Sequence, residues 1–349
     1  MNRYRHSRKH GCRIFDDLVY KGYEALVLEN QLLRVTVLVG KGADIIEFLH
    51  KPTDVDFTSW TPQGLRPPYS MPSTAPTPRS TFFDIYEGGW QEVFPNGGPP
   101  TIFHGAEIGQ HGEVSMSPWD YEILEDTPEL VAVRLVVETL KVPFRVEKIM
   151  SLRSGEARLS ITEKVINLSS EAIPVMWGQH LAFGLPFLSD ECFIDIAPEV
   201  EVIPHVGALN EFGRISREGS YTWPFVMSPS NQQVDLSRVP SEGVPSDIFY
   251  LKGFPTGFYA IRNLQTKLRI EVSWDHQMFP YLWYWIEGGR DKNYPWYGRH
   301  YAVGLEPFSS FPTNGLEESI VNGTAKTIGP HEEVETWLSI AVSQLEGFV

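Results

Sequence analysis

Apolar and polar residues alternate with a period of two along most of the chain. The alternating stretches are rich in β-branched and aromatic residues, and short turns containing glycine or proline separate them. No long stretch keeps a helical spacing of apolar residues with a capping residue at both ends. We therefore predict strands at residues 31–38, 43–49, 131–140, 144–152, 157–168, 175–183, 192–196, 268–274, 281–286, 301–305 and 335–342.

The order of these strands predicts an all-β fold, a large antiparallel β-sandwich. Residues 31–49 predict a hairpin whose turn, Gly40-Lys-Gly42, uses glycine for positive φ angles. Strands spread evenly with turns between them favour stacked antiparallel sheets over alternating strands and helices. We expect a single domain over residues 1–349, with an N-terminal extension at 1–24 and a loop insertion at 62–79, which is rich in Pro, Ser and Thr.

Charge and cysteine content exclude several classes of function. The formal net charge of −15 provides no excess of Lys and Arg to replace the counterions of a nucleic acid. No apolar run resembles a signal peptide or a membrane span, which predicts a cytoplasmic protein that does not bind membranes. The two cysteines, Cys12 and Cys192, do not form a disulfide framework and are expected to be reduced. The sequence does not predict the oligomeric state.

Candidate chemistry is limited to histidines and carboxylates. The chain lacks a phosphate-binding glycine loop, a zinc-binding HExxH helix, a CxxC pair and a GxSxG nucleophile turn. His180 lies in an otherwise apolar stretch, where a buried histidine of the core is the simpler interpretation. Glu306 precedes a proline, so we expect its strand to end there, and a solvated carboxylate is the simpler interpretation. His104 and His111 lack further ligands at a metal-binding spacing, so no metal is predicted.

Four short segments favour a functional role for His180 and Glu306, because of the order in which the segments follow one another along the chain. They begin at residues 88, 111, 177 and 304 and read GGWQEVFP, HGEVSMSPW, WGQHLAF and GLEP. An aspartate before an aromatic residue and a leucine, Asp247, falls between the last two. In this order, over residues 28–344, the chain resembles the galactose mutarotase-like superfamily and especially the aldose 1-epimerase family.

This resemblance implies a supersandwich fold and the interconversion of the α and β anomers of a free sugar. By the same resemblance, His180 is the general acid, Glu306 is the general base, and His111 and Asp247 bind substrate hydroxyl groups. Neither a metal nor another cofactor is implied. Aromatic residues can stack on a sugar, and we select Trp119 and Trp285 as substrate-binding candidates, although burial in the core is the simpler role for any one of them.

Departures from the family pattern narrow the prediction. Gln179 stands where many galactose mutarotases have Asn, and Ile248 where they have His, so we expect a changed shell around the sugar. Glu87 stands where hexose-6-phosphate mutarotases have Arg, which favours a neutral sugar because a carboxylate repels phosphate. Two alternatives stay open: a noncatalytic carbohydrate-binding sandwich, and a glycosidase or lyase that uses Glu306 and Asp247 as paired carboxylates.

Overall fold

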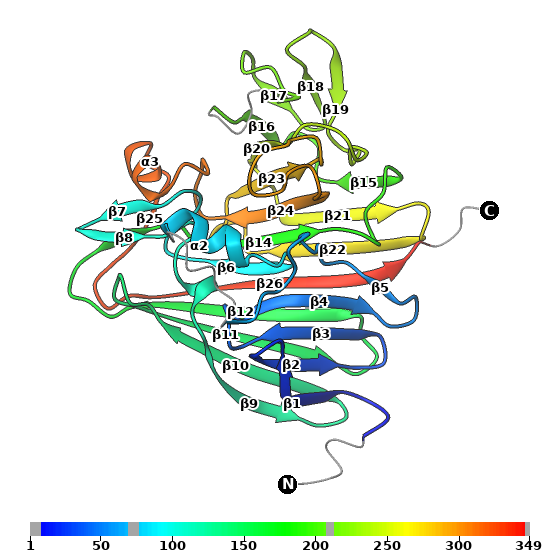
Figure 1. Ribbon diagram of the computed structural model, residues 1–349, viewed down its shortest axis with the longest axis vertical. Helices are drawn as coiled ribbons and strands as arrows, with labels where there is room; N and C mark the ends of the chain where they lie inside the picture. The colour runs from blue at the N-terminus through cyan, green and yellow to red at the C-terminus, as the bar shows by residue number, and fades with distance from the viewer. Residues whose placement is uncertain (1–7, 69–76, 207–212, 346–349) are drawn as a thin grey trace.

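Two large antiparallel sheets pack face to face in the computed structural model, which describes residues 8–68, 77–206 and 213–345 (Figure 1). Within these residues the larger sheet has 14 strands. In spatial order they are β1 (Arg13–Tyr20), β2 (Tyr23–Glu29), β3 (Leu33–Leu38), β4 (Asp44–His50), β6 (Trp90–Val93), β14 (Gly178–Phe183), β24 (Ala302–Phe308), β23 (Tyr281–Glu287), β20 (Asp247–Lys252), β16 (Glu201–Pro204), β17 (Tyr221–Thr222), β18 (Phe225–Met227) and β19 (Gln233–Asp235), with β5 (Val55–Asp56) paired to β4.

The smaller sheet has eight strands in the described chain. In spatial order they are β15 (Cys192–Asp195), β21 (Gly257–Asn263), β22 (Leu268–Trp274), β26 (Glu333–Gln344), β12 (Arg158–Asn167), β11 (Phe144–Arg153), β10 (Leu130–Glu138) and β9 (Asp120–Asp126). The short pairs are β13 (Ile173–Val175) with β25 (Lys326–Ile328) and β7 (Thr101–Phe103) with β8 (Ala106–Ile108). The helices are α2 (Pro78–Ile85), α3 (Leu316–Val321) and a 3₁₀ turn (Val114–Met116). The predicted all-β fold class is confirmed.

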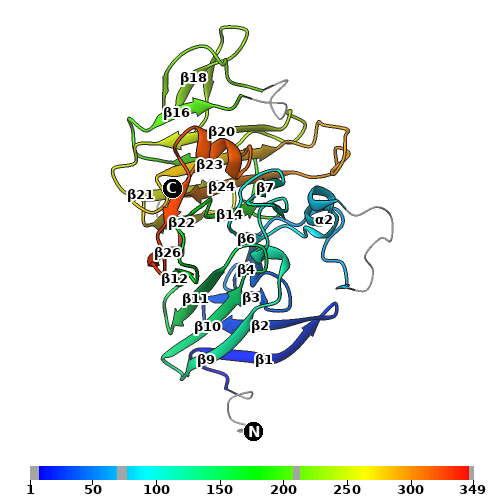
Figure 2. The same ribbon diagram turned by 90° about the vertical axis from the view of Figure 1, so that its left-hand side faces the viewer.

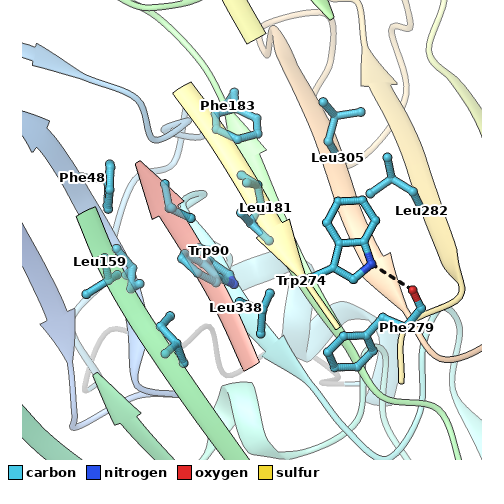
Figure 3. Close-up of a cluster of buried hydrophobic side chains, with 14 of the residues drawn as sticks. Phe48, Trp90, Leu159, Leu181, Phe183, Trp274, Phe279, Leu282, Leu305 and Leu338 are labelled. Carbon is cyan, nitrogen blue, oxygen red and sulfur yellow. Dashed lines mark hydrogen bonds between the residues drawn. The ribbon is translucent and has the colours of Figure 1, made fainter. Parts of the chain in front are cut away.

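The hydrophobic core lies between the two sheets. Alternate residues of β11 and β12 are buried, as expected for strands with one face on the core and one toward solvent. Figure 3 shows Leu159 and Leu338 of the smaller sheet beside Trp90 and Leu181 of the larger sheet. The buried Trp274 indole also lies here and donates a hydrogen bond to the Phe279 carbonyl oxygen at 2.9 Å, so its polar group is satisfied.

The centre of the larger sheet is covered on both faces. Every residue of β14 and β24 is buried, whereas a sheet with one free face shows alternation. Figure 2 shows α2 on the side of the larger sheet that faces away from the smaller sheet. Polar side chains on the outer face of β14 and β24 are therefore removed from bulk solvent, and they have to be satisfied by one another or by a ligand.

Most predicted strands are present, and two differ in a way that matters for the site. The stretch 175–183 is divided into β13 and β14, because the backbone N–H groups of Met176 and Trp177 donate to Pro95 O and Ser309 Oγ instead of continuing a strand ladder. The stretch 301–305 does not end before Glu306, since β24 continues to Phe308. Pro307 lies opposite Leu282 of β23, whereas no paired positions join β14 and β24 between Gly178–Phe308 and Ala182–Gly304.

The expected N-terminal extension and loop insertion are both partly structured. From Arg13 onward, the segment 1–24 forms β1 and the start of β2, so it contributes the edge of the larger sheet and is not an appendage. Residues 1–7 lie outside the described residues. In the segment 62–79, residues 62–68 are without regular strand or helix, 69–76 lie outside the described residues, and α2 begins at residue 78. No helix of the described chain has the length and apolar content needed to cross a bilayer.

Candidate active site

A cavity of about 290 Å³ lies on the outer face of the larger sheet. Its floor is formed by β14, β24, β23 and β20, and its walls are formed by α2 and the segment from residue 291 to 296. The residues that line it are Arg79, Phe82, Phe83, Tyr86, Gln110, His111, His180, Pro245, Ser246, Ile248, Trp283, Trp285, Glu287, Asp291, Asn293, Tyr294, Pro295, Trp296, Glu306 and Thr313.

Strand register brings His180 and Glu306 together on the floor. Gly178 pairs with Phe308 and Ala182 pairs with Gly304, so residue 180 lies opposite residue 306 on the neighbouring strand. Side chains opposite each other in an antiparallel pair point to the same face. The His180 Nε2 and Glu306 Oε1 atoms are 3.7 Å apart, and both side chains line the cavity. The sequence predicted these two residues as partners, and the fold places them in one pocket.

Gly304 provides the space that the Glu306 carboxyl group occupies. The two residues are two positions apart on β24 and therefore share a face of the sheet. A Cβ atom added at Gly304 would lie 2.3 Å from Glu306 Oε1 and 3.2 Å from Trp285 Cε3. The carboxyl group thus lies directly over the glycine, and any larger residue there displaces it.

We expect Gly304→Ala to reduce turnover by about 10–100-fold, since a displacement of about 1 Å at a reacting group has effects of this size. The strand itself tolerates alanine, so thermal unfolding should show a folded protein. Steady-state kinetics of the single variant and of a Gly304→Ala/Glu306→Gln double variant check the cause. Relative to Glu306→Gln alone, the added alanine should cause little further loss, because the alanine acts through Glu306. Wild-type turnover in the single variant would contradict this role of Gly304.

Burial determines the protonation of the pair. It raises the pKa of Glu306 well above its usual range, because the charged carboxylate loses its hydration. Burial lowers the pKa of His180 to about 4 for the same reason. Among the described residues no Lys or Arg forms an ion pair with Glu306. Burial therefore favours the neutral imidazole of His180 and the protonated form of the Glu306 carboxyl group.

His111 is the second imidazole of the pocket. Its ring lies 5.3 Å from the His180 ring and 4.8 Å from the Phe82 ring, measured between centroids. Burial, and secondarily the proximity of His180, lowers its pKa well below the usual range, so the ring is neutral. Because His111 Nδ1 accepts a hydrogen bond from the Gly98 N–H at 3.2 Å, its Nε2 carries the ring proton and is a donor.

The fold brings together some predicted site residues and separates others. His111, His180, Trp285 and Glu306 line the cavity. Trp119 does not: it lies in the core between the sheets, where its indole N–H donates to Val114 O at 3.0 Å.

Asp247 also lies away from the cavity, which corrects its expected role as a sugar ligand. It pairs across the sheet with Ile286, whereas its neighbour Ile248 pairs with Trp285 on the pocket face. The Asp247 carboxylate accepts a hydrogen bond from the Arg214 N–H at 2.9 Å and is buried. Alternation along β20 therefore turns Asp247 inward and places Ile248 and Ser246 in the pocket.

Glu287 is a pocket carboxylate that the sequence interpretation missed. It follows Trp283 and Trp285 at the same spacing of two along β23, and all three line the cavity. Glu287 could have been predicted from the sequence, because the alternation that places the two tryptophans on one face of the strand also places residue 287 on that face. Tyr86 and Trp296 were also missed, because they come from α2's C-terminal side and from a loop, where no period predicts direction.

Gln179 lies on the opposite face of β14, in a buried polar cluster. Its side-chain NH₂ group donates to Glu92 Oε1 and Glu163 Oε2, both at 2.9 Å. Lys148 Nζ forms ion pairs with Glu92 at 2.6 Å and Glu163 at 3.3 Å. The departure from Asn at this position therefore changes the interior behind the site and not the shell that faces the cavity.

Glu87 does not act as expected either. Its side chain is buried and forms an ion pair with Lys41 Nζ at 2.8 Å, next to the Lys41–Asp44 pair. It does not line the cavity. Its charge is compensated, so it gives no reason to exclude a phosphate from the pocket.

No group of three or more His, Cys, Asp or Glu side chains in the described residues has the arrangement of a metal site. Cys12 and Cys192 are both buried free thiols.

Comparison with known proteins identifies the fold and the family. No curated protein sequence matches the chain. A protein of Klebsiella pneumoniae described as a "putative aldose 1-epimerase" is 13% identical and has a TM-score of 0.73, over 96% of this chain and 84% of that one. A galactose mutarotase-like protein of Clostridium acetobutylicum is 16% identical, with a TM-score of 0.66 over 96% and 99% of the two chains. One of Lactobacillus casei is 15% identical, with a TM-score of 0.60 over 91% and 100%.

These similarities establish a galactose mutarotase-like β-sandwich. A family model matches residues 20–342, nearly the whole described chain, and its description is "Domain of unknown function (DUF4432)". The chain therefore belongs to the DUF4432 family and has the fold of the galactose mutarotase-like proteins.

Proposed function

We propose that this protein is an aldose 1-epimerase that interconverts the α and β anomers of a free, neutral sugar. The observation that carries the proposal is the pair of His180 and Glu306, 3.7 Å apart in one cavity. Similar structures carry the names aldose 1-epimerase and galactose mutarotase-like protein, which agrees with a sugar substrate.

The reaction requires one acid and one base on the same side of a sugar. The base takes the proton of the hydroxyl group on C1 while the acid delivers a proton to the ring oxygen. The bond between C1 and the ring oxygen breaks, and the open-chain aldehyde forms. Rotation about the C1–C2 bond and the reverse proton transfers then close the ring as the other anomer. No atom is gained or lost, and the two groups end with the number of protons they started with.

One proton on the pair of His180 and Glu306 satisfies this requirement. With the proton on Glu306, the carboxyl group is the acid and the neutral imidazole is the base. With the proton on His180, the roles are those that the family resemblance implies. The two states interconvert by one proton transfer, and ring opening of one anomer leaves the pair ready for closure to the other. Catalysis therefore requires that the pair holds one proton in total, on either residue.

The glycosidase or lyase alternative, in the form that pairs Glu306 with Asp247, is less favoured, because Asp247 does not line the cavity. The His180–Glu306 pair favours the epimerase over a noncatalytic binding module, because sugar binding alone does not require an acid and a base 3.7 Å apart.

The proposal is tested by dissolving single crystalline anomers of galactose, glucose, xylose and arabinose and following optical rotation with and without the protein. Catalysed equilibration of at least one sugar supports the proposal. Rates equal to buffer for every sugar, with binding detected by calorimetry, would instead support a binding module.

Neutral sugars are expected to bind at least about 10-fold more tightly than their 6-phosphates. A phosphate monoester carries close to two negative charges and needs donors such as Arg. Arg79 is the only Lys or Arg among the described lining residues, and it lies exposed at the rim, whereas Glu287 and Asp291 add carboxyl groups inside. Apparent affinities for glucose and glucose 6-phosphate at two salt concentrations check this. Tighter binding of the phosphate that weakens with salt would contradict it.

A further inference from the structure

The cavity has a second polar region at the end of β23. Trp283 pairs with Glu306, and Glu287 lies four residues further along the same strand and on the same face. Glu306 and Glu287 both line the same cavity of about 290 Å³, Glu306 beside His180 and Glu287 at the end of β23. A pocket of this volume is at the small end of the range for small-molecule sites and suits one sugar ring.

Glu287 has unused capacity to accept hydrogen bonds. Its side chain is buried, with an exposed fraction of 3%, yet it lines the cavity. Oε2 accepts a hydrogen bond from Ser246 Oγ at 2.8 Å, and Oε1 accepts one from the Gly289 N–H at 3.2 Å. A carboxylate has about four lone-pair sites, so about two remain. No Lys or Arg of the described chain forms an ion pair with it, unlike the buried carboxylates of Glu87 and Glu92.

Ser246 fixes a second carboxyl group beside the first. Its hydroxyl group donates to Glu287, and its backbone N–H donates to Asp291 Oδ2 at 3.1 Å. Ser246 and Asp291 also line the cavity. A shared serine therefore holds two acceptors in place at one end of the pocket. Burial, and to a smaller extent the charge of Asp291, raises the pKa of Glu287 to about 7, so added hydrogen-bond donors there are favourable.

We propose that Glu287 binds a hydroxyl group remote from the anomeric carbon of the sugar, with Asp291 beside it, and so determines which neutral sugars the pocket accepts. This inference rests on the proposed function in that it places C1 at His180 and Glu306. It assigns to Glu287 the part that the sequence had assigned to Asp247. Glu287 is a binding residue here, and it takes no part in the proton transfers.

The test compares wild type with Glu287→Gln, using Glu335→Gln, an exposed carboxylate of β26 on the other sheet, as the control. Calorimetry gives Kd, and anomer exchange gives KM and kcat, for the sugar that binds best and for its 2-, 3-, 4- and 6-deoxy forms. We expect Glu287→Gln to raise Kd and KM by about 10–100-fold, the loss typical of a hydrogen bond to a charged group, with kcat changed less than about 3-fold. The control should match wild type.

The deoxy series identifies the hydroxyl group and needs no variant to fold. In wild type, one deoxy sugar should bind at least about 10-fold more weakly than the rest, and that difference should disappear in Glu287→Gln. If circular dichroism shows Glu287→Gln unfolded, Glu287→Asp, which keeps the charge on a shorter side chain, replaces it. Unchanged Kd in a folded variant, equal binding of all deoxy sugars, or no sugar binding to wild type would each overturn the inference. A Kd effect in a protein without exchange activity would support it and would reject the epimerase proposal alone.

Discussion

Replacing Glu306 by glutamine is expected to slow anomer exchange by about 10²–10⁴-fold, the contribution of a positioned proton-transfer group. Glutamine has nearly the same shape, fits over Gly304, and still accepts and donates hydrogen bonds, but it cannot take or release a proton. Sugar binding should therefore be retained while kcat falls. Saturation kinetics by polarimetry, together with Kd from calorimetry, separate the two quantities.

The matched control for this variant is again Glu335→Gln, which makes the same chemical change at an exposed position. It should leave kcat and KM unchanged. Retention of near-wild-type kcat in folded Glu306→Gln would remove Glu306 from the proton transfers and leave no base or acid to accompany His180.

His180→Asn is expected to lower kcat by about 10²–10⁴-fold, because the pair then lacks the group that exchanges protons with Glu306. The pH profile of wild type follows from the two pKa directions. The active pair holds one proton. Below about pH 4 the His180 ring also becomes protonated, the pair holds two protons, and no base remains. Once pH exceeds the raised pKa of the Glu306 carboxyl group, that group loses its proton and no acid remains.

We therefore expect kcat to fall toward acid below about pH 4, where His180 gains a proton, and to fall again at higher pH, once Glu306 loses its proton. The acid fall should be absent from the residual activity of His180→Asn. Circular dichroism at each pH shows whether the protein is folded there. An acid fall near pH 6.5 instead of about pH 4 would mean that the His180 ring titrates near its ordinary pKa, against the effect of burial.

Period-two alternation predicted the fold because it is a local property that an antiparallel sandwich keeps along each strand. Alternation could predict which side chains of a strand face the pocket only where at least one residue had already been assigned to that face. On β23 the two tryptophans fixed the phase, and Glu287 follows from it. No strand was predicted at β20, and Asp247 was assigned to the pocket by the family resemblance alone, although Ile248 faces the pocket.

Local alternation cannot predict contacts between side chains that are far apart in the sequence. Lys41 forms an ion pair with Glu87 across 46 residues, and Lys148 Nζ lies 5.6 Å from the centre of the Trp119 ring, 29 residues away. The end of β24 was predicted too early because proline usually terminates a strand. A strand can continue through proline where the adjacent strand accepts no hydrogen bond from that position, and this depends on the tertiary structure. The pairing of His180 with Glu306 came from the order of motifs, and the strand register gives its physical basis.

The central claim, that the protein catalyses exchange between anomers, is tested most directly by two-dimensional proton NMR exchange spectroscopy at equilibrium. A sugar that has already reached its anomeric ratio is mixed with the protein, and exchange between the two anomeric proton signals is recorded by two-dimensional NMR. We predict exchange cross-peaks that require the protein, disappear with Glu306→Gln and His180→Asn, and leave the total of both anomers unchanged. Exchange at the buffer rate for every sugar that binds would contradict the assignment as an aldose 1-epimerase. New reducing-end signals in a second sample, in which a glycoside replaces the free sugar, would also contradict it.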